Sequence, residues 1–512
     1  MSDFDAEVIV IGSGPAGVSA ALPLVEAGRR VLMIDAASDT EALGGPWQRK
    51  LGAHLESLTP DDGLSPKLRT PEARRTIGAF KRQGQDKEED FVTTGSLARG
   101  GLSRIWGAFV SEFDDDDMSG WPLTAAELKP SYRAVVERIG VSGSSDDHMA
   151  DFYGRCGPLL PPPPLDPTAA SILGHYAGRK PEAGFALGLA RNALLTIARE
   201  QRQACELAFG CLWGCERGAI YEARQDIARL RRHTESFALR DRTTAVRLTR
   251  TAKGWEVATA SGERSLRAPR LVIAAGTLGS LRLIAPLLDP LPPLRLLNSP
   301  VMAMPLLVLR RLGSEPPAQG YALAQLGFRL ICSQARGDYV TGGLYAVSGL
   351  PPSSFAARLP FGRRAATDIF RALAPALTVA TVYFPGHYSA NQVTIRQSGA
   401  GPRIHIRGGV TDQFPQIADS VRQRLKKIWR RLGAHALPGA ALATAGTDAH
   451  LGGLFPMGAP QPYGTSRFGE LNAAPGLHLV DGSVLPSVPA KFTTLTIMAN
   501  ADRIGRHLAG AA

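Results

Sequence analysis

The segment EVIVIGSGPAGVSAALPLVEAGRRVLMIDA spans residues 7–36 and has the pattern of a buried strand, a tight turn, a helix and a second buried strand. Gly12, Gly14 and Gly17 form the motif G-x-G-x-x-G directly after the first apolar run. In this motif the first glycine permits the turn, the second lets the backbone approach a pyrophosphate, and the third lets the helix pack closely against the strand. Asp35 ends the second strand, where a carboxylate can accept hydrogen bonds from a ribose. The arrangement predicts a dinucleotide-binding α/β fold but does not distinguish FAD from NAD.

The composition is that of an ordinary globular protein, because 44% of the 512 residues are hydrophobic and 20% are charged. A chain of this length has room for two or three domains. The first residues, MSDFDAEVIVIG, carry two aspartates where a secretory leader carries lysine or arginine. The apolar run after them is too short to span a bilayer. We therefore expect a cytoplasmic protein whose five cysteines are mainly reduced thiols.

The chain has a formal net charge of +12, which would attract phosphates or anionic lipids. The densest basic run, RQRLKKIWRRLG at residues 422–433, has apolar residues at helical spacing and predicts a surface helix with a solvated basic face. Peripheral contact of this face with a membrane is a second interpretation. No nucleic-acid-binding motif accompanies the run, so we expect no nucleic-acid partner. The acidic run Asp114–Asp117 predicts a solvated loop.

Two further regions complete the outline of the fold. RLVIAAGTLGSLRLI, residues 270–284, has the pattern of another buried strand that enters a glycine turn and a helix. Between about residues 300 and 440, apolar runs such as PLLVLRR, ALTVATVYF and NQVTIR predict strands separated by helices. This second region suits a sheet domain inserted into the dinucleotide-binding fold.

Four segments in this order resemble the glucose-methanol-choline family of FAD-dependent oxidoreductases. They are GSGPAG at residues 12–17, GGLSRIWGAFVSEFDDDDMSGWPLTAAELKPSYRAVVERIG at 100–140, LVIAAGTLGSLRLI at 271–284 and HLVDGSVLPSVPAKFTTLTIMANADRIG at 478–505. The resemblance implies FAD as the cofactor, a Rossmann-like FAD-binding domain with a doubly wound sheet, and an inserted α+β substrate-binding domain. The expected FAD-binding domain comprises residues 1–135, 190–295 and 446–512, and the substrate-binding domain comprises residues 136–189 and 296–445.

The resemblance also assigns residues to the cofactor. Gly12, Gly14, Gly17 and Asp35 would hold the adenosine half of FAD, with Val246 near the adenine and Ala275 in the turn beside it. Gly100, Gly101, Ser103, Trp106 and Gly107 would surround the pyrophosphate and the flavin. Asp481, Gly482, Thr494 and Thr496 would contact the ribitol and the pyrimidine end. The flavin loop, residues 95–108, contains no histidine to which FAD could be attached, so we expect noncovalent FAD.

The same resemblance points to a catalytic histidine. HLGGLFPMG, residues 450–458, matches a stretch whose histidine faces the flavin, which makes His450 the base that takes the proton from a substrate hydroxyl. A neutral imidazole suits this step because its pKa lies near working pH.

One position departs from the family. Where relatives have a second polar residue, His or Asn, this chain has Phe492, and a shift of one in register would offer Lys491 or Thr493 instead. Phenylalanine cannot hydrogen-bond a substrate. Either His450 works alone on a substrate that packs an apolar face against Phe492, or alcohol oxidation has been weakened or replaced.

Cys205, Cys211 and Cys215 lie close together in the segment CELAFGCLWGC, residues 205–215. Their spacing resembles a branch of the same family, the cytochrome-linked sugar and polyol dehydrogenases, in which three such cysteines bind a three-iron cluster. Thiolates are natural ligands for iron, but this segment lacks the polar run that separates the cysteines in that branch. Buried or loop thiols are therefore favoured, an iron-sulfur cluster is the alternative, and a zinc site or a disulfide is less favoured.

The resemblance thus implies an FAD-dependent dehydrogenase or oxidase that oxidises a CH–OH group of a small-molecule alcohol, polyol or sugar, with hydride transfer to the flavin. The resemblance does not identify the electron acceptor, which could be oxygen, a quinone or a cytochrome. Two alternatives are a flavoprotein of the same fold with desaturase or redox-neutral activity, and a catalytically degenerate homologue that only binds FAD.

Overall fold

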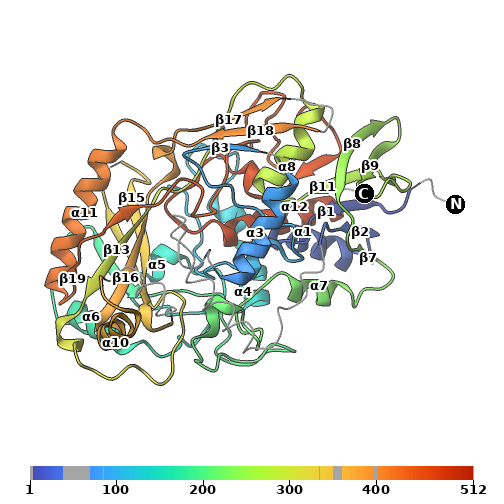
Figure 1. Cartoon of the computed structure of the whole chain (residues 1–512). Coiled ribbons are helices and arrows are strands. Elements are labelled where there is room, and N and C mark those ends of the chain that lie inside the picture. Colours follow the sequence, from blue (N-terminus) through green and yellow to red (C-terminus); the bar gives the residue numbers. More distant parts are fainter. Residues whose placement is uncertain are drawn as a thin grey trace.

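The computed structural model describes residues 4–37, 68, 70–84, 86–333, 335–349, 360–396 and 401–510. Two large sheets organise the molecule and lie toward opposite ends of it (Figure 1). One is a parallel sheet built around the N-terminal glycine motif, and the other is an antiparallel sheet built mainly from residues 301–442. None of the helices in the described ranges is long and apolar enough to cross a membrane.

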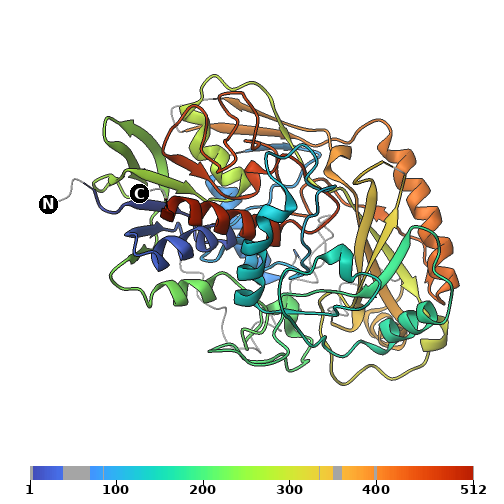
Figure 2. The same cartoon turned by 180° about the vertical axis from the view of Figure 1, so that it is seen from behind.

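The parallel sheet has five strands in the order β21-β11-β1-β2-β7. They are β1 (Val8–Ile11), β2 (Val31–Ile34), β7 (Phe237–Arg240), β11 (Arg270–Ile273) and β21 (Leu477–Leu479). β1, α1 (Pro15–Glu26) and β2 form the strand-helix-strand unit that residues 7–36 predict. The C-terminal helix α12 (Thr494–Gly510) lies beside α1 on one face of the sheet (Figure 2). The predicted Rossmann-like α/β class is thereby confirmed.

Shorter elements surround this sheet. A three-stranded antiparallel sheet, in the order β10-β9-β8, stands between β7 and β11 in the chain. Its strands are β8 (Ala245–Thr251), β9 (Gly254–Thr259) and β10 (Leu266–Ala268). The helices of this part of the chain are α3 (Pro71–Gln83), α4 (Ala125–Ile139), α5 (Ala150–Tyr153), α7 (Arg224–Leu230) and α8 (Thr277–Ile284). A small parallel pair joins β4 (Val141–Ser142) to β5 (Leu159–Leu160).

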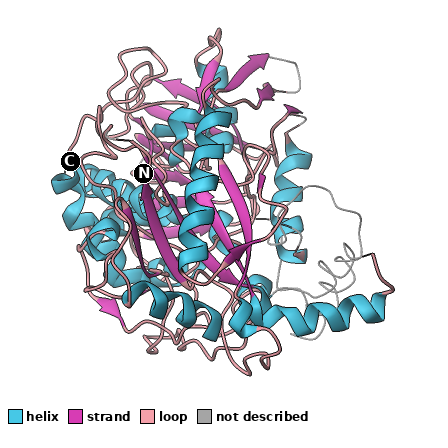
Figure 3. Cartoon of the chain, turned by 90° about the vertical axis from the view of Figure 1, so that its left-hand side faces the viewer, coloured by secondary structure: helices cyan, strands magenta, loops and turns pink. Residues whose placement is uncertain are grey.

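The antiparallel sheet has two faces with different surroundings. Its seven strands are β6 (Phe185–Leu189), β13 (Val301–Leu307), β14 (Leu326–Ile331), β15 (Tyr339–Ala346), β16 (Leu377–Tyr383), β19 (His435–Ala436) and β20 (Ala441–Leu442). α6 (Pro167–Ala177) and α11 (Phe414–Arg431) pack against one face, and α11 lies across the strands in Figure 3. α10 (Arg363–Leu373) stands between β15 and β16 in the sequence. The other face borders the cavity described below.

The basic run at 422–433 belongs to α11, whose Val421, Leu425, Ile428 and Trp429 are buried against the sheet. The predicted amphipathic helix is therefore confirmed, because its apolar face is used within the fold and its basic residues lie on the other side.

A four-stranded sheet connects distant parts of the chain. It comprises β3 (Lys87–Glu89), β12 (Leu294–Leu296), β17 (Asn391–Arg396) and β18 (Arg403–Arg407), and β3 pairs with β18. All strands of the parallel sheet come from the segments expected for FAD binding, and all strands of the seven-stranded sheet come from those expected for the substrate domain. β3 crosses this division, so the domain boundaries stay a prediction.

Candidate active site

A large cavity of about 850 Å³ extends from the carboxyl ends of the parallel strands to the face of the seven-stranded sheet that α6 and α11 leave uncovered. This volume is at the upper end of the range for small-molecule and cofactor sites. Residues that follow β1, β2, β11 and β21 line one part of it, and residues of β13, β15 and β16 line another. Ligands of open α/β sheets bind at the carboxyl ends of the strands, so the cavity is where a dinucleotide is expected.

The glycine motif forms one wall of this cavity. Gly12 has a φ of +104°, and a Cβ there would lie 2.4 Å from the carbonyl oxygen of Ala274. A Cβ on Gly17 would lie 2.0 Å from the carbonyl oxygen of Gly12, so α1 can approach β1 only without a side chain there. A Cβ on Gly14 would meet no protein atom closer than the Cα of Gly101, at 3.9 Å. Gly12 and Gly17 are thus required by the protein's own packing, whereas Gly14 leaves space that a ligand can use.

Asp35 lines the cavity and also holds the glycine turn. Its carboxylate accepts hydrogen bonds from the backbone N–H of Ser13, at 2.9 Å, and of Ala37, at 2.8 Å. Burial raises the pKa of Asp35, and these hydrogen bonds act in the opposite direction. The hydroxyl of Ser13 accepts a hydrogen bond from the backbone N–H of Gly100 at 3.0 Å and so joins the two glycine loops. The motif does not single out Ser13, because its middle positions accept many residue types.

The flavin loop closes over the same wall. Gly100 and Gly101 both have positive φ values, and Gly101 begins the short 3₁₀ helix Gly101–Arg104. The Ser103 hydroxyl donates to the carbonyl of Gly100 at 2.6 Å and accepts from the backbone N–H of Ala223 at 2.9 Å. The Trp106 indole donates to the carbonyl of Tyr221 at 2.8 Å. These bonds fix the loop whose Gly101, Ser103, Trp106 and Gly107 line the cavity.

The remaining predicted cofactor residues are distributed along the cavity. Val246, Ala275, Asp481, Gly482 and Thr494 all line it. Burial raises the pKa of Asp481, whose carboxylate accepts hydrogen bonds from Ser280 and Ser483. Thr496 is different, because it is fully buried away from the cavity and its hydroxyl is hydrogen-bonded to that of Tyr132 at 2.7 Å.

These residues fit a bound FAD. Gly14, Pro15 and Ala16 at the N-terminus of α1 line the cavity, and the positive end of a helix dipole suits a pyrophosphate. A Cβ on Gly14 would meet no protein atom closer than 3.9 Å, so the backbone there leaves room for the close approach that a phosphate needs. A Cβ on Gly101 would lie 3.2 Å from the Cα of Gly14, so the two glycine loops pack closely against each other.

His450 lies in the part of the cavity that faces the seven-stranded sheet. Its ring centroid is 5.3 Å from that of Tyr383 and 6.0 Å from that of Phe492. The preceding residue, Ala449, has a φ of +60°, which is uncommon for a residue with a side chain. The surroundings must therefore hold this turn in place.

The side chain of Asp448 stabilises the turn that carries Ala449 and His450. Its buried carboxylate accepts hydrogen bonds from the side-chain amide of Asn298 at 3.0 Å and from the backbone N–H groups of Ser299 at 3.1 Å and His450 at 3.2 Å. Burial raises the pKa of Asp448 to about 6. Asp448 was not among the predicted residues. Its closeness to His450 in the sequence is the one signal that could have found it.

The loop before α12 brings Phe492 to the cavity and turns Lys491 away from it. Phe492 stacks on Phe109 with ring centroids 4.1 Å apart, and both rings line the cavity. Thr493 also lines it. Phenylalanine, rather than lysine, therefore stands beside His450.

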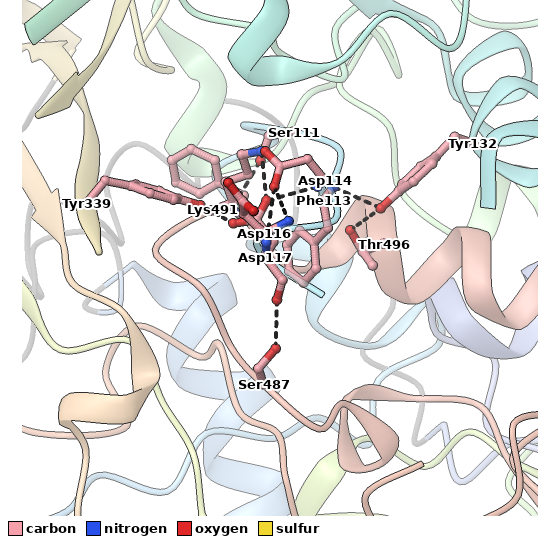
Figure 4. Close-up of polar contacts among 11 residues, drawn as sticks. Ser111, Phe113, Asp114, Asp116, Asp117, Tyr132, Tyr339, Ser487, Lys491 and Thr496 are labelled. Atoms are coloured by element: carbon pink, nitrogen blue, oxygen red, sulfur yellow. Dashed lines mark hydrogen bonds and ion pairs between the residues drawn. The ribbon is translucent and has the colours of Figure 1, made fainter. Parts of the chain in front are cut away.

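The acidic run is solvated only in part, because Asp114, Asp115 and Asp116 are exposed whereas Asp117 is buried. The buried ammonium of Lys491 lies 2.8 Å from carboxylate oxygens of both Asp114 and Asp117 (Figure 4). Tyr339 of β15 donates to Asp117, whose side chain is completely buried. Burial raises the pKa of Asp117. For Asp114, burial also acts to raise the pKa, but the charge and hydrogen bond of Lys491 together with backbone hydrogen bonds outweigh it and lower the pKa.

The three clustered cysteines show no metal centre. Among the described residues, no group of three or more His, Cys, Asp or Glu side chains is arranged to hold a metal ion. The Sγ atom of Cys211 accepts a hydrogen bond from the backbone N–H of Ala322 at 3.3 Å. Burial raises the pKa of Cys211 to about 12 and also raises that of Cys205, so both are thiols at neutral pH. The described geometry therefore offers no cluster site at Cys205, Cys211 and Cys215.

Comparison with known proteins agrees with this geometry. Residues 388–501 match the family model described as GMC oxidoreductase, and residues 6–83 match the model described as pyridine nucleotide-disulphide oxidoreductase. Paromamine 6'-oxidase of Streptomyces fradiae is 25% identical over 555 aligned positions, which cover 98% of this chain and 91% of the relative. The crystal structure of pyridoxine 4-oxidase from Mesorbium loti matches with a TM-score of 0.61 at 15% identity, over 98% of this chain and 99% of that one. At this identity the structural likeness shows the fold alone.

Residues of the glycine turn at 12–17, of the flavin loop and of the C-terminal segment all line one cavity. The two family models match an N-terminal and a C-terminal part of the same chain. Together these findings support a GMC-type FAD-dependent oxidoreductase.

Proposed function

We propose that this protein oxidises a CH–OH group of a small-molecule alcohol or sugar, with His450 as the base that accepts the hydroxyl proton. The observation that carries the proposal is the position of His450, whose imidazole lines the cofactor cavity where it meets the substrate-side sheet. Asp448 holds the backbone of the turn that carries His450, so the turn is in place before a substrate binds.

Bound FAD would accept the hydride, with both electrons of the C–H bond, so that the alcohol becomes a carbonyl compound while its hydroxyl proton goes to His450. The residues that would hold it are the glycine turn at 12–17, the loop at 100–107 and the buried Asp481. The loop offers no histidine for covalent attachment, so we propose that FAD is held by these contacts alone.

The substrate would lie on the face of the seven-stranded sheet. Val301 and Ala303 of β13, Val379 and Thr381 of β16, and Tyr345 of β15 line this part of the cavity. The name of the relative paromamine 6'-oxidase supports a small-molecule substrate. Because that relative is named an oxidase, we favour dioxygen over a quinone or a cytochrome as the acceptor, with hydrogen peroxide as its product.

The test is anaerobic reduction of the purified flavoprotein by a panel of benzyl alcohol, pyridoxine, paromamine, glucose and 1-butanol. At least one alcohol should bleach the flavin absorption, and His450→Ala should slow this reduction by about 10² to 10⁴-fold. His507→Ala is the matched control, because His507 stacks on Phe468 outside the cavity lining.

Two outcomes would contradict the proposal. If no alcohol reduces the tightly bound flavin, a desaturase, a redox-neutral enzyme or a degenerate FAD-binding protein is favoured instead. If His450→Ala is reduced as fast as the parent, His450 is not the base. Admission of air to the reduced enzyme and measurement of hydrogen peroxide then tests the acceptor.

A further inference from the structure

Tyr383 is the last residue of β16, and its side chain lies on the sheet face that lines the cavity. Because side chains alternate along a strand, Val379 and Thr381 share this face, while Ala380 and Val382 are fully buried on the other. The alternation therefore directs Tyr383 into the same cavity as His450.

Tyr383 contacts both residues that the sequence motifs single out. Its ring centroid lies 5.3 Å from that of His450, with an angle of 33° between the planes. It lies 5.3 Å from the centroid of Phe492, with an angle of 77°. His450 and Phe492 are 6.0 Å apart, so the three rings form a compact triangle in which Tyr383 alone carries a hydroxyl.

The hydroxyl of Tyr383 is available, unlike that of its neighbour on the same sheet face. Tyr345 of β15 is hydrogen-bonded to the side chain of Thr381. In the described part of the chain, the Tyr383 hydroxyl has no such partner. Burial raises the pKa of Tyr383 well above its usual value, so the hydroxyl keeps its proton at any working pH. Tyr383 is only partly buried and lines the cavity, so a ligand oxygen there can accept a hydrogen bond from its hydroxyl.

We propose that the Tyr383 hydroxyl donates a hydrogen bond to the substrate oxygen and thereby supplies the second polar contact that Phe492 cannot make. The inference rests on the proposed alcohol oxidation. As the substrate proton moves to His450, negative charge grows on the oxygen, and a donor already held in place stabilises that charge. Contact with the rings of His450 and Phe492 fixes the donor before the substrate arrives.

Tyr383→Phe tests this role, because it removes the hydroxyl and keeps the ring. Anaerobic reduction by the panel alcohol that reduces the parent fastest should slow about 10²-fold. Binding of 2,2,2-trifluoroethanol, followed by the change in flavin absorption, should weaken as well, while FAD content and melting temperature stay at parent values. Phe492→Asn added to Tyr383→Phe should recover part of the lost rate, because it returns a polar group to the triangle.

The matched control is Tyr388→Phe. The Tyr388 hydroxyl donates to Asp338 at 3.0 Å, and Tyr388 lies outside the cavity lining, so this variant should keep the parent rate. Reduction of Tyr383→Phe at the parent rate would overturn the inference, and so would loss of FAD, which would mean that the hydroxyl supports the cofactor. If the flavin is reduced slowly in His450→Ala but at the parent rate in Tyr383→Phe, the role of Tyr383 is refuted and the proposed function is not. A parent that no alcohol reduces refutes the proposed function itself.

Discussion

Lys491 and Phe492 are adjacent in the chain, but only Phe492 faces the cavity. The ammonium of Lys491 lies 2.8 Å from carboxylate oxygens of Asp114 and Asp117, while the ring of Phe492 stacks on Phe109 at 4.1 Å. The backbone N–H of Phe492 also donates to the hydroxyl of Ser111 at 3.2 Å. A buried ion pair thus anchors the loop whose next residue forms an aromatic wall of the active site.

Lys491→Met should destabilise the protein by about 3 to 5 kcal/mol, because it leaves the completely buried Asp117 carboxylate without its cation. Adding Asp117→Asn should recover part of this loss, because the uncompensated charge is then gone. The free energy of unfolding from urea denaturation measures both effects. Lys87→Met is the control: its ion pair with Glu89 is largely exposed and should be worth less than about 1 kcal/mol. Equal losses for Lys491→Met and Lys87→Met would refute the anchoring role.

Gly14→Val should give a folded protein without FAD. Gly14 has an ordinary extended conformation, with φ −68°, and a Cβ there meets no protein atom within 3.4 Å, so the space that valine would fill is the space predicted for the pyrophosphate. Flavin absorption and circular dichroism of the purified variant measure cofactor and fold separately. Gly12→Ala should instead damage the fold, because its Cβ would lie 2.4 Å from the carbonyl oxygen of Ala274. Full flavin content in Gly14→Val would exclude this turn as the FAD site.

The N-terminal half of the site could be predicted because its signals are local. The turn at 12–17 must satisfy steric rules that act within one strand-helix unit, and β1, α1 and β2 follow them. The periodic patterns around 300–440 likewise predict strands, which appear as β13, β16 and β17, and the 3.6-residue pattern at 422–433 predicts α11.

The rest depends on contacts between distant segments. Asp114 and Lys491 are 377 residues apart, and four consecutive aspartates favour solvent until the fold brings a buried cation to them. Tyr383 belongs to no motif and gains its place only when β16 aligns beside the turn that carries His450. Such residues are set by tertiary packing, which a single sequence does not display.

Asp448→Asn should change how stability depends on pH. Burial raises the pKa of Asp448 from an ordinary value near 3.8 to about 6, so the folded state keeps the proton longer than the unfolded state. This contribution is complete below about pH 4 and is lost as the pH rises through about 6. The free energy of unfolding of the parent, relative to Asp448→Asn, should therefore fall by on the order of 3 kcal/mol between pH 4 and pH 7. Urea denaturation at several pH values measures the difference. A difference between the parent and Asp448→Asn that stays the same at every pH would contradict the raised pKa, because altered hydrogen bonds alone give such a constant offset.

Phe492→Asn and Phe492→Leu together separate the two effects that the aromatic ring exerts on the site. Both variants lose the stack on Phe109 and the edge contact with Tyr383, so both should lower the free energy of unfolding, by about 1 to 3 kcal/mol. Both also enlarge the cavity beside His450 and should raise the KM of the alcohol that fits the parent best. Only asparagine can hydrogen-bond the substrate oxygen, so only Phe492→Asn should raise kcat for small alcohols such as 1-butanol, by up to about 10²-fold. Steady-state kcat and KM for both variants measure the distinction. If Phe492→Leu gains the small alcohols as well as Phe492→Asn does, the ring acts by volume alone and position 492 has no polar role to recover.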